Sequence, residues 1–366
     1  MKVTIKREEL LPALQIVNGV VERRQTLPIL SNLLLSVGDK QLTMTASDME
    51  VELVAELDKQ GSESGDITLP ARKLLDICRT LPEDAEIRLE TSGDQAHVVS
   101  RKSRFTLSTL PAQEYPLVEI AAPLADFKLP QKTLKQLLDR TAFAMAHQDV
   151  RYYLNGLLLE LDSSRIRAVA TDGHRLALCD ADHKLKLDEP LQIIVPRKGV
   201  QELVRLLEDS DEEAAVQISS NHIRVRLPGL QFTSKLIDGK FPDYGRVIPD
   251  TGEHPLVADR EVLRQSLTRA SILSNEKYRG VRLLLDKGRL RAIAHNPEQE
   301  EAEEELEVEY SGPEMEIGFN VSYLLDALSI IRTNTVFITI KDPSSSCLLL
   351  PEEGKECKYV VMPMRL

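Results

Sequence analysis

The sequence predicts an α+β fold in which three similar domains follow one another along the chain, and two observations favour it. A short strand followed at once by an amphipathic helix occurs six times. In addition, Ala46-Ser47-Asp48, Ala170-Thr171-Asp172 and Ala294-His295-Asn296 succeed one another at steps of 124 residues. Solenoid repeats are only ~20–50 residues long, so a step of this length indicates repeated domains.

The strand-then-helix unit is clearest at residues 193–207, which read IIVPRKGVQELVRLL. A β-branched run ends in Pro196, and the apolar residues Val200, Leu203 and Leu207 then follow at helical spacing. Proline suits the first turn of a helix, so we expect the helix to begin there. The same unit recurs, more or less closely, from Val3, Ile67, Phe127, Leu256 and Ile317.

Between these units lie runs that alternate apolar and polar residues, as at residues 42–46 and 51–57. Such alternation is typical of strands with one buried face. Few connections outside the helical units are long enough for parallel crossovers, so we expect antiparallel sheets with two helices in each domain. Boundaries beside proline-containing connectors give predicted domains at residues 1–125, 126–252 and 253–366.

Composition indicates a globular protein of the cytosol. The 366 residues are 42% hydrophobic, and no run approaches the ~18 apolar residues of a membrane span. The start of the chain leads directly into a strand, so we expect no signal peptide. Four cysteines lie far apart without a C-x-x-C motif, which predicts reduced, mostly structural thiols. Seven scattered histidines lack the spacing of metal ligands, and we expect no metal or cofactor.

The net charge of −12 by itself argues against a general nucleic-acid binder, but basic residues gather at the helix starts. A cation there opposes the helix dipole by ~0.3–1 kcal/mol, so its repetition favours a row of phosphate contacts. Ordinary solvated helix faces are the alternative. With no Trp and 4% aromatic residues, any DNA contact would be to the backbone and independent of sequence. These basic residues are Arg72, Lys73, Lys132, Lys135, Arg197, Lys198, Arg260 and Arg264.

An acidic run at residues 296–310 carries eight glutamates, and its apolar residues Leu306, Val308 and Tyr310 alternate with them. Alternation predicts a strand rather than a helix. A basic run at residues 100–107 in the first domain has the opposite charge. The two edges could join head to tail between two copies of the chain and close a ring. A solvated edge strand that charge protects from aggregation is the alternative.

The stretch Thr171-Asp172-Gly173-His174-Arg175 resembles a catalytic centre because a histidine lies close to an aspartate. No nucleophile elbow, phosphate-binding loop or metalloprotease motif accompanies it. The Asp-Gly pair favours a turn between two strands instead. We therefore expect no catalytic residue, and a hydrolase at Asp172 and His174 is kept only as an alternative.

The chain ends in YVVMPMRL, residues 359–366, which is apolar and contains two methionines. Tails usually turn polar and fray. We expect either a last core strand or one wall of a groove that binds a partner's peptide, a role for which methionine is well suited.

Specific stretches along the whole chain resemble one family closely, the bacterial sliding clamps, which are the β subunits of DNA polymerase III. They include MAHQDVRYYLNG, ATDGHRLA, KFPDYGRV, NPEQEEAEE and the terminal YVVMPMRL. The resemblance implies a head-to-tail homodimeric ring of six similar domains, whose helices line a hole for double-stranded DNA. It implies a non-catalytic processivity subunit in the cytoplasm. A monomeric peptide-binding scaffold that does not encircle DNA is the alternative.

The resemblance also implies partners and residue roles. The partners are the DNA polymerase III α subunit, the clamp loader, translesion polymerases, and mismatch-repair and ligase proteins, which bind through linear motifs. The implied peptide-binding residues, between the second and third domains, are Leu154, Thr171, Gly173, His174, Arg175, Leu176, Pro242, Arg246, Val247, Tyr323, Ser346, Val360, Met362, Pro363, Met364 and Arg365. The implied DNA contacts are Arg24, Arg72, Gln148, Tyr152, Tyr153, Lys198, Tyr278 and Arg279. The implied dimer contacts are Lys73, Ile77, Lys102, Arg104, Phe105 and Leu107 against Ile272, Leu273, Glu298, Glu301 and Glu304.

Overall fold

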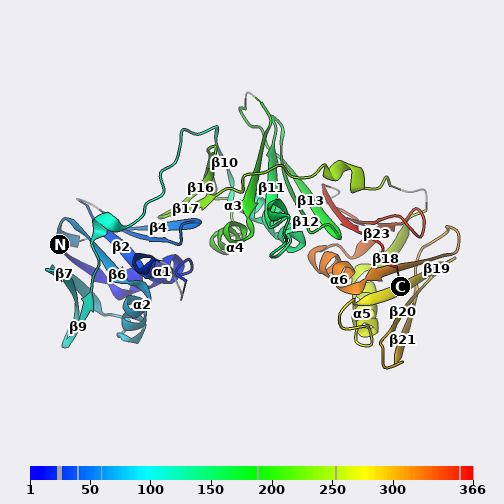
Figure 1. The fold of residues 1–366 in the computed structure, drawn as a ribbon, viewed down its shortest axis with the longest axis horizontal. Helices are drawn as coiled ribbons and strands as arrows, with labels where there is room; N and C mark the ends of the chain where they lie inside the picture. The colour runs from blue at the N-terminus through cyan, green and yellow to red at the C-terminus, as the bar shows by residue number, and fades with distance from the viewer. Residues whose placement is uncertain are drawn as a thin grey trace. The chain divides into compact units, whose positions relative to one another are not determined.

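Figure 1 shows the fold, taken from a computed structural model of the chain. The structure describes residues 1–22, 27–38, 41–58, 60–187, 189–251, 254–353 and 356–365. The chain forms two compact units. Unit one consists of Met1–Leu134 with Lys198–Ile237, and unit two consists of Lys135–Arg197 with Asp238–Leu366.

Unit one contains two antiparallel sheets. The five-stranded sheet has the order β5 (Gln60–Glu63), β1 (Lys2–Lys6), β7 (Glu86–Ser92), β8 (Gln95–Ser100), β9 (Ser103–Ser108). The eight-stranded sheet has the order β10 (Ala125–Pro130), β15 (Glu213–Ile218), β16 (His222–Leu227), β17 (Leu230–Lys235), β4 (Val51–Asp58), β3 (Gln41–Ser47), β2 (Asn32–Val37), β6 (Gly65–Pro70). Helices α1 (Arg7–Val17) and α2 (Ala71–Thr80) lie side by side and pack on these sheets (Figure 1).

Unit two also contains two antiparallel sheets. The eight-stranded sheet has the order β14 (Leu191–Pro196), β11 (Gly156–Leu161), β12 (Arg165–Thr171), β13 (Arg175–Asp182), β25 (Cys357–Val361), β24 (Cys347–Pro351), β23 (Thr335–Thr339), β18 (Leu256–Asp259). The four-stranded sheet has the order β21 (Glu301–Glu307), β20 (Arg289–His295), β19 (Gly280–Asp286), β22 (Met315–Asn320). Helices α5 (Arg260–Ser271) and α6 (Val321–Ile330) pack against each other, and α5 covers β20 and β21 (Figure 1).

Two strand pairings join distant parts of the sequence. In the first seam, β17 pairs with β4 from Leu230↔Ala55 to Ser234↔Val51. In the second seam, β13 pairs with β25 from Arg175↔Val361 to Cys179↔Cys357. Each eight-stranded sheet therefore takes strands from two of the predicted domains, and the predicted boundaries themselves stay a prediction.

All six strand-then-helix units are confirmed in the described residues. The remaining two are β10 followed by α3 (Gln131–Asp139) and β14 followed by α4 (Arg197–Leu206). Asp259 and Asn320 cap their helices with side-chain oxygens that accept from Val262 N and Ser322 N. The first nitrogen of several helices also donates to the carbonyl of a neighbouring loop, whether or not proline precedes the helix. Gln131 N donates to Glu212 O at 2.8 Å, and Arg260 N donates to Asn334 O at 2.7 Å.

The predicted strand in the acidic run is confirmed as β21, in which Leu306 is buried and the glutamates around it are exposed. The predicted turn between β12 and β13 is confirmed as well. Within the described part of the chain, every helix is too short or too polar to span a lipid bilayer.

The prediction of four reduced thiols differs from the structure at two of them, which are bonded here. Cys179 and Cys357 form a disulfide, whereas Cys78 and Cys347 are free and buried. The bonded pair lies 178 residues apart in sequence, and only the second seam brings the two residues opposite each other. Spacing along the chain carries no signal for such a pair.

Replacing Phe232 by Ala should weaken the first seam, because Phe232 is fully buried on β17 opposite Leu53. Removing a buried aromatic ring costs about 3–5 kcal/mol of unfolding free energy. Urea denaturation followed by circular dichroism measures the loss as a lower midpoint. The control Leu117→Ala, at a side chain 59% exposed, should leave the midpoint unchanged. Equal midpoints for Phe232→Ala and Leu117→Ala would contradict this account of the seam.

Candidate functional site

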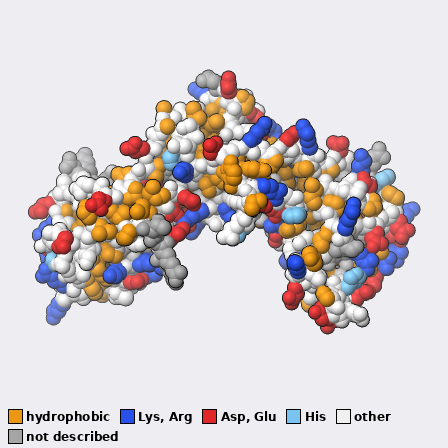
Figure 2. Space-filling view, viewed as in Figure 1, with side chains coloured by type: hydrophobic (Ala, Val, Ile, Leu, Met, Phe, Trp, Pro, Cys, Tyr) orange, Lys and Arg blue, Asp and Glu red, His pale blue; other side chains and the backbone are white. Residues whose placement is uncertain are grey.

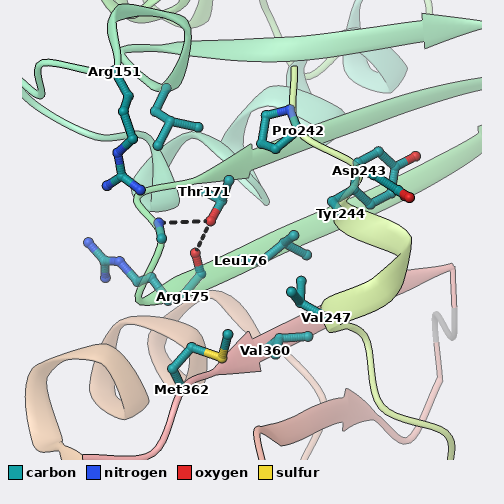
Figure 3. A pocket seen from close by; sticks show the side chains of 12 residues that line it. Arg151, Thr171, Arg175, Leu176, Pro242, Asp243, Tyr244, Val247, Val360 and Met362 are labelled. Carbon is teal, nitrogen blue, oxygen red and sulfur yellow. Dashed lines mark hydrogen bonds between the residues drawn. The ribbon is translucent and has the colours of Figure 1, made fainter. Parts of the chain in front are cut away.

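A cavity of about 180 Å³ lies in unit two at one end of the second seam (Figure 3). It is lined by residues that precede β11, by the turn from β12 to β13 and the start of β13, by the loop that contains the 3₁₀ helix η5 (Tyr244–Val247), and by β25 with the residues that follow it. We call it the groove. Its lining residues are Arg151, Leu154, Thr171, Gly173, Arg175, Leu176, Pro242, Asp243, Tyr244, Val247, Val360 and Met362.

One wall of the groove is the turn from β12 to β13. The hydroxyl of Thr171 donates to Arg175 O at 2.7 Å and accepts from Gly173 N at 3.0 Å (Figure 3). Gly173 has φ +88°, and a Cβ there would come within 2.9 Å of the Arg151 side chain. Both facts favour glycine at this position. The turn is therefore a rigid wall.

Arg175 ties this wall to its surroundings. Its Nε donates to Asp172 Oδ2 at 3.1 Å, its Nη2 donates to Phe143 O at 3.0 Å, and its Nη1 pairs with Asp326 on α6. The guanidinium also lies 4.7 Å from the centre of the Tyr323 ring, in cation–π geometry. An arginine held on so many sides has little freedom left, so it shapes the groove.

The hydrolase alternative at Asp172 and His174 finds no support in this geometry. Asp172 Oδ1 accepts from the backbone nitrogens of His174 and Arg175, at 2.9 and 3.0 Å, and its second oxygen holds the Arg175 side chain. The His174 ring stacks on Tyr323 with 6.1 Å between ring centres. The carboxylate is used to hold the turn, as a structural aspartate would be.

Tyr244 and Arg167 fix the opposite wall. The Tyr244 hydroxyl hydrogen-bonds Glu160 and accepts from Arg167 Nη1 at 3.2 Å, while Arg167 grips Asp180 with two bonds of 2.6 and 2.8 Å. Burial, and then the hydrogen bond to Glu160, raise the pKa of Tyr244 to about 12. The hydrogen bonds to Glu160 and from Arg167 hold the neutral phenol in place beside the groove.

The inside of the groove is apolar. Leu154, Leu176 and Val360 are almost completely buried at its base, and Met362 is half-buried at its edge. Charged side chains lie at its border: Arg151 hydrogen-bonds Asp149, and this bond is the main reason that the pKa of Asp149 falls to about 2. An apolar base with a polar border suits the side chains of a short peptide.

Nine of the sixteen predicted peptide-binding residues line the groove, and the other seven do not. His174 and Tyr323 flank Arg175, Ser346 Oγ donates to Val247 O at 3.2 Å, Arg246 pairs with Asp243 at 2.8 Å, and Pro363 follows Met362. Met364 and Arg365 line a separate cavity together with Tyr278. The prediction missed Arg151, Asp243 and Tyr244; the last two lie within the stretch KFPDYGRV.

The predicted DNA contacts differ in their freedom to reach a ligand. Arg24 lies outside the described residues. Lys198 pairs with Glu22 and Asp48 of its own unit. Burial lowers the pKa of Lys198, but the hydrogen bonds to Asp48 and Glu22 outweigh burial, so its pKa is raised overall. Arg72 is exposed, with one bond of 3.3 Å to Val21 O. Five of the predicted DNA contacts lie in unit two. Gln148, Tyr152 and Tyr278 are exposed there, and Tyr153 and Arg279 are half-buried.

Five of the eleven predicted dimer contacts lie on two outer strands, β9 and β21, and the other six lie on α2, after α5 or in turns. β9 is the outer strand of the five-stranded sheet and carries exposed Arg104; Phe105 is half-buried, and Leu107 is buried within its own sheet. Lys102 is exposed in the preceding turn, and Lys73 and Ile77 are exposed and half-buried on α2.

The second edge is acidic. β21 is the outer strand of the four-stranded sheet and carries exposed Glu301, whereas Glu304 accepts from Arg269 at 2.5 and 2.8 Å and from Ser266 at 2.9 Å. Glu298 is exposed in the preceding turn, Ile272 is 73% exposed after α5, and Leu273 is half-buried. Figure 2 shows acidic and basic side chains mixed over β19–β21, and one such pair is Arg291 with Glu303 at 3.3 Å.

Comparisons with known proteins agree over the whole chain. Sequence profiles of the DNA polymerase III beta subunit match residues 1–119 as the N-terminal domain, residues 128–243 as the central domain and residues 245–365 as the C-terminal domain. The beta sliding clamp of Pseudomonas aeruginosa is 53% identical, and that of Escherichia coli K12 is 51% identical, each with 100% of both chains covered.

A crystal structure of the DNA polymerase III subunit beta from Pseudomonas aeruginosa has the same fold. It superposes with a TM-score of 0.98 at 53% identity and covers 100% of both chains. The three profile matches, the identity and the shared fold point to one conclusion. The chain belongs to the bacterial β sliding clamps, the non-catalytic processivity subunits of DNA polymerase III.

Proposed function

We propose that two copies of this chain close head to tail into a ring around duplex DNA, and that the groove holds short linear peptides of its partners. The partners proposed are the polymerase α subunit, the clamp loader, translesion polymerases, and mismatch-repair and ligase proteins. The ring would tether a polymerase to its template by topology. Each rebinding of the polymerase then becomes an intramolecular event at high effective concentration. The proposed location is the cytoplasm.

The observation that carries the peptide-binding role is the groove itself. It combines an apolar base with walls that intramolecular bonds already hold in place. A site prepared in this way loses little entropy when a peptide binds. Exposed Arg246 and half-buried Met362 leave room for contacts at the border.

Charge at the two sheet edges supports the ring. In the described part of the chain, β9 and β21 each pair with a neighbouring strand on one side only. One edge is basic and the other is acidic, so a second copy can offer the opposite charge to each. Two such contacts related by twofold symmetry would close the assembly.

Weak phosphate contacts suit a ring that slides. The candidate residues Arg72, Tyr152, Tyr278 and Arg279 include no constellation that reads base edges, and phosphate contacts bind any sequence equally. Lys198 would have to exchange its two carboxylate partners for phosphate, so we expect it to contribute less than Arg279.

Replacing Met362 by Asp should weaken peptide binding at least about tenfold, which is about 1.4 kcal/mol, because it puts a charge beside an apolar base. Fluorescence anisotropy with a labelled peptide that carries the linear motif of the polymerase α subunit measures the Kd. The matched control Leu117→Asp, exposed in unit one, should bind the peptide as the parent does. A peptide that binds both variants equally would place the binding site elsewhere.

Replacing Arg104 by Glu should weaken the dimer at least about tenfold, because it puts like charges at the joined edges. Sedimentation velocity over a dilution series measures the monomer–dimer equilibrium. Arg226→Glu is the control, since Arg226 is exposed on β16 within the eight-stranded sheet. Should Arg104→Glu stay dimeric over the same range as Arg226→Glu, β9 is not the dimer edge.

Retention on DNA distinguishes the ring from a monomeric scaffold. After loading by the clamp loader and ATP, the protein should stay on nicked circular DNA during gel filtration and should leave when a restriction enzyme cuts the circle. A topological link predicts this loss, whereas simple affinity predicts equal retention on both forms. Equal retention on circular and linear DNA would favour the scaffold.

A further inference from the structure

The disulfide between Cys179 and Cys357 lies in the second seam, which also carries the groove. Leu176 of β13 and Val360 of β25 are opposite each other in the ladder and line the groove. Cys179 and Cys357 are opposite each other three residues further along the same two strands. The bond therefore joins the two strands that form part of the groove, at the end of the ladder away from it.

A guanidinium lies against the two sulfurs. Arg140 Nη1 is 3.5 Å from Cys357 Sγ and 3.9 Å from Cys179 Sγ. Glu356 Oε1 accepts from the same nitrogen at 3.2 Å and so helps to hold the arginine in this position. A cation next to a thiol favours the thiolate, which is the form that reacts with oxidants.

The other two cysteines are as buried as this pair, but neither is bonded to a second cysteine. Burial raises the pKa of Cys78 to about 12, and burial also raises the pKa of Cys347. Both are free and buried. A raised pKa keeps a thiol protonated and poorly reactive, and neither of these two is paired with a second thiol that could complete a disulfide. The chain thus provides its own internal controls for any oxidation of Cys179 and Cys357.

We propose that Cys179 and Cys357 are a redox modification site: two thiols in reducing conditions, which hydrogen peroxide converts to the disulfide that locks the second seam. The thiolate of one cysteine attacks a peroxide oxygen, which breaks the O–O bond and gives a sulfenic acid and, after proton uptake, water. The second thiol attacks the sulfenic sulfur and releases another water. One peroxide is reduced, two thiols are oxidised, and two waters form. Both cysteines are at most 2% exposed, which favours a small uncharged oxidant over glutathione disulfide.

Oxidation should make the second seam more resistant to opening. The bond closes a loop between residues 178 positions apart, and a covalent link over so long a loop removes much of the freedom of the opened state. Strand β25 pairs with β24 and with β13, and the bond holds it on the β13 side. Any effect on peptide binding rests on the proposed function of the groove, whereas the modification itself does not.

Differential alkylation of the full-length dimer tests the site. The protein is reduced with millimolar dithiothreitol, which is small and uncharged, desalted, treated with increasing hydrogen peroxide, alkylated after unfolding, and analysed by mass spectrometry of a non-reducing digest. We expect a Cys179–Cys357 cross-linked peptide to accumulate while Cys78 and Cys347 remain alkylated. Oxidation of Cys78 or Cys347 at the same peroxide dose would overturn the proposal. A pair that stays bonded in dithiothreitol would also overturn it, because the bond would then be permanent.

Two arginine variants test the role of Arg140. Arg140→Met should slow formation of the cross-link by peroxide at least about threefold at neutral pH, and Arg140→Lys should keep most of the rate. The control Arg165→Met lies on β12 and pairs with Asp162 and Asp180, away from the sulfurs. Equal rates for Arg140→Met and Arg165→Met would show that the guanidinium does not activate the pair.

Hydrogen exchange tests the consequence for the seam. Amides of β13 and β25 should exchange more slowly in the oxidised protein than in the reduced one, and Tm should rise by about 3 °C or more. In Cys357→Ser, peroxide should change neither quantity, while in Cys347→Ser both changes should remain. Identical exchange in the two redox states of the parent protein would mean that the bond forms without locking the seam.

Discussion

The groove depends on one interaction, the antiparallel hydrogen-bond ladder between β13 and β25. The ladder sets Leu176 opposite Val360, and its continuation, from Met362 N to His174 O at 2.8 Å, carries the chain past the wall of the groove. A register slip of one residue would turn every side chain of β25 to the other face of the sheet. The position of Met362 is therefore a property of backbone pairing.

Half-buried ion pairs fix the segments beside the groove that the ladder does not hold. Arg175 joins the turn before β13 to α6, and Arg167 joins β12 to β13 and to the loop that carries Tyr244. A guanidinium suits both places because its planar group donates in several directions at once. The groove walls therefore keep their shape without a bound peptide, and the same strategy in unit one engages Lys198 with Glu22 and Asp48.

Much of the fold and of the groove could be predicted from the sequence, but the hydrogen-bond and packing partners of each residue could not. Thr171, Gly173 and Arg175 stand in one short stretch, and their turn follows from local chemistry. The prediction missed Tyr244 and Arg151 because their roles depend on residues of other elements. Tyr244 bonds Glu160 and Arg167, and Arg151 lies against Gly173, where a Cβ would otherwise be. The predicted DNA contact Lys198 is engaged by carboxylates from two distant segments, and no pattern along the chain reveals that.

The sequence by itself determined the repeating strand-then-helix unit, the alternation that makes strands, and the opposite charges of the two runs that become β9 and β21. These are local properties, because the period of the side chains along a helix or a strand is written in neighbouring residues. Only the tertiary structure decided which strands meet at the seams, and with them the groove and the union of Cys179 with Cys357. Such pairings join residues far apart in the chain, and their partners are chosen by backbone hydrogen bonds and burial across the whole sheet.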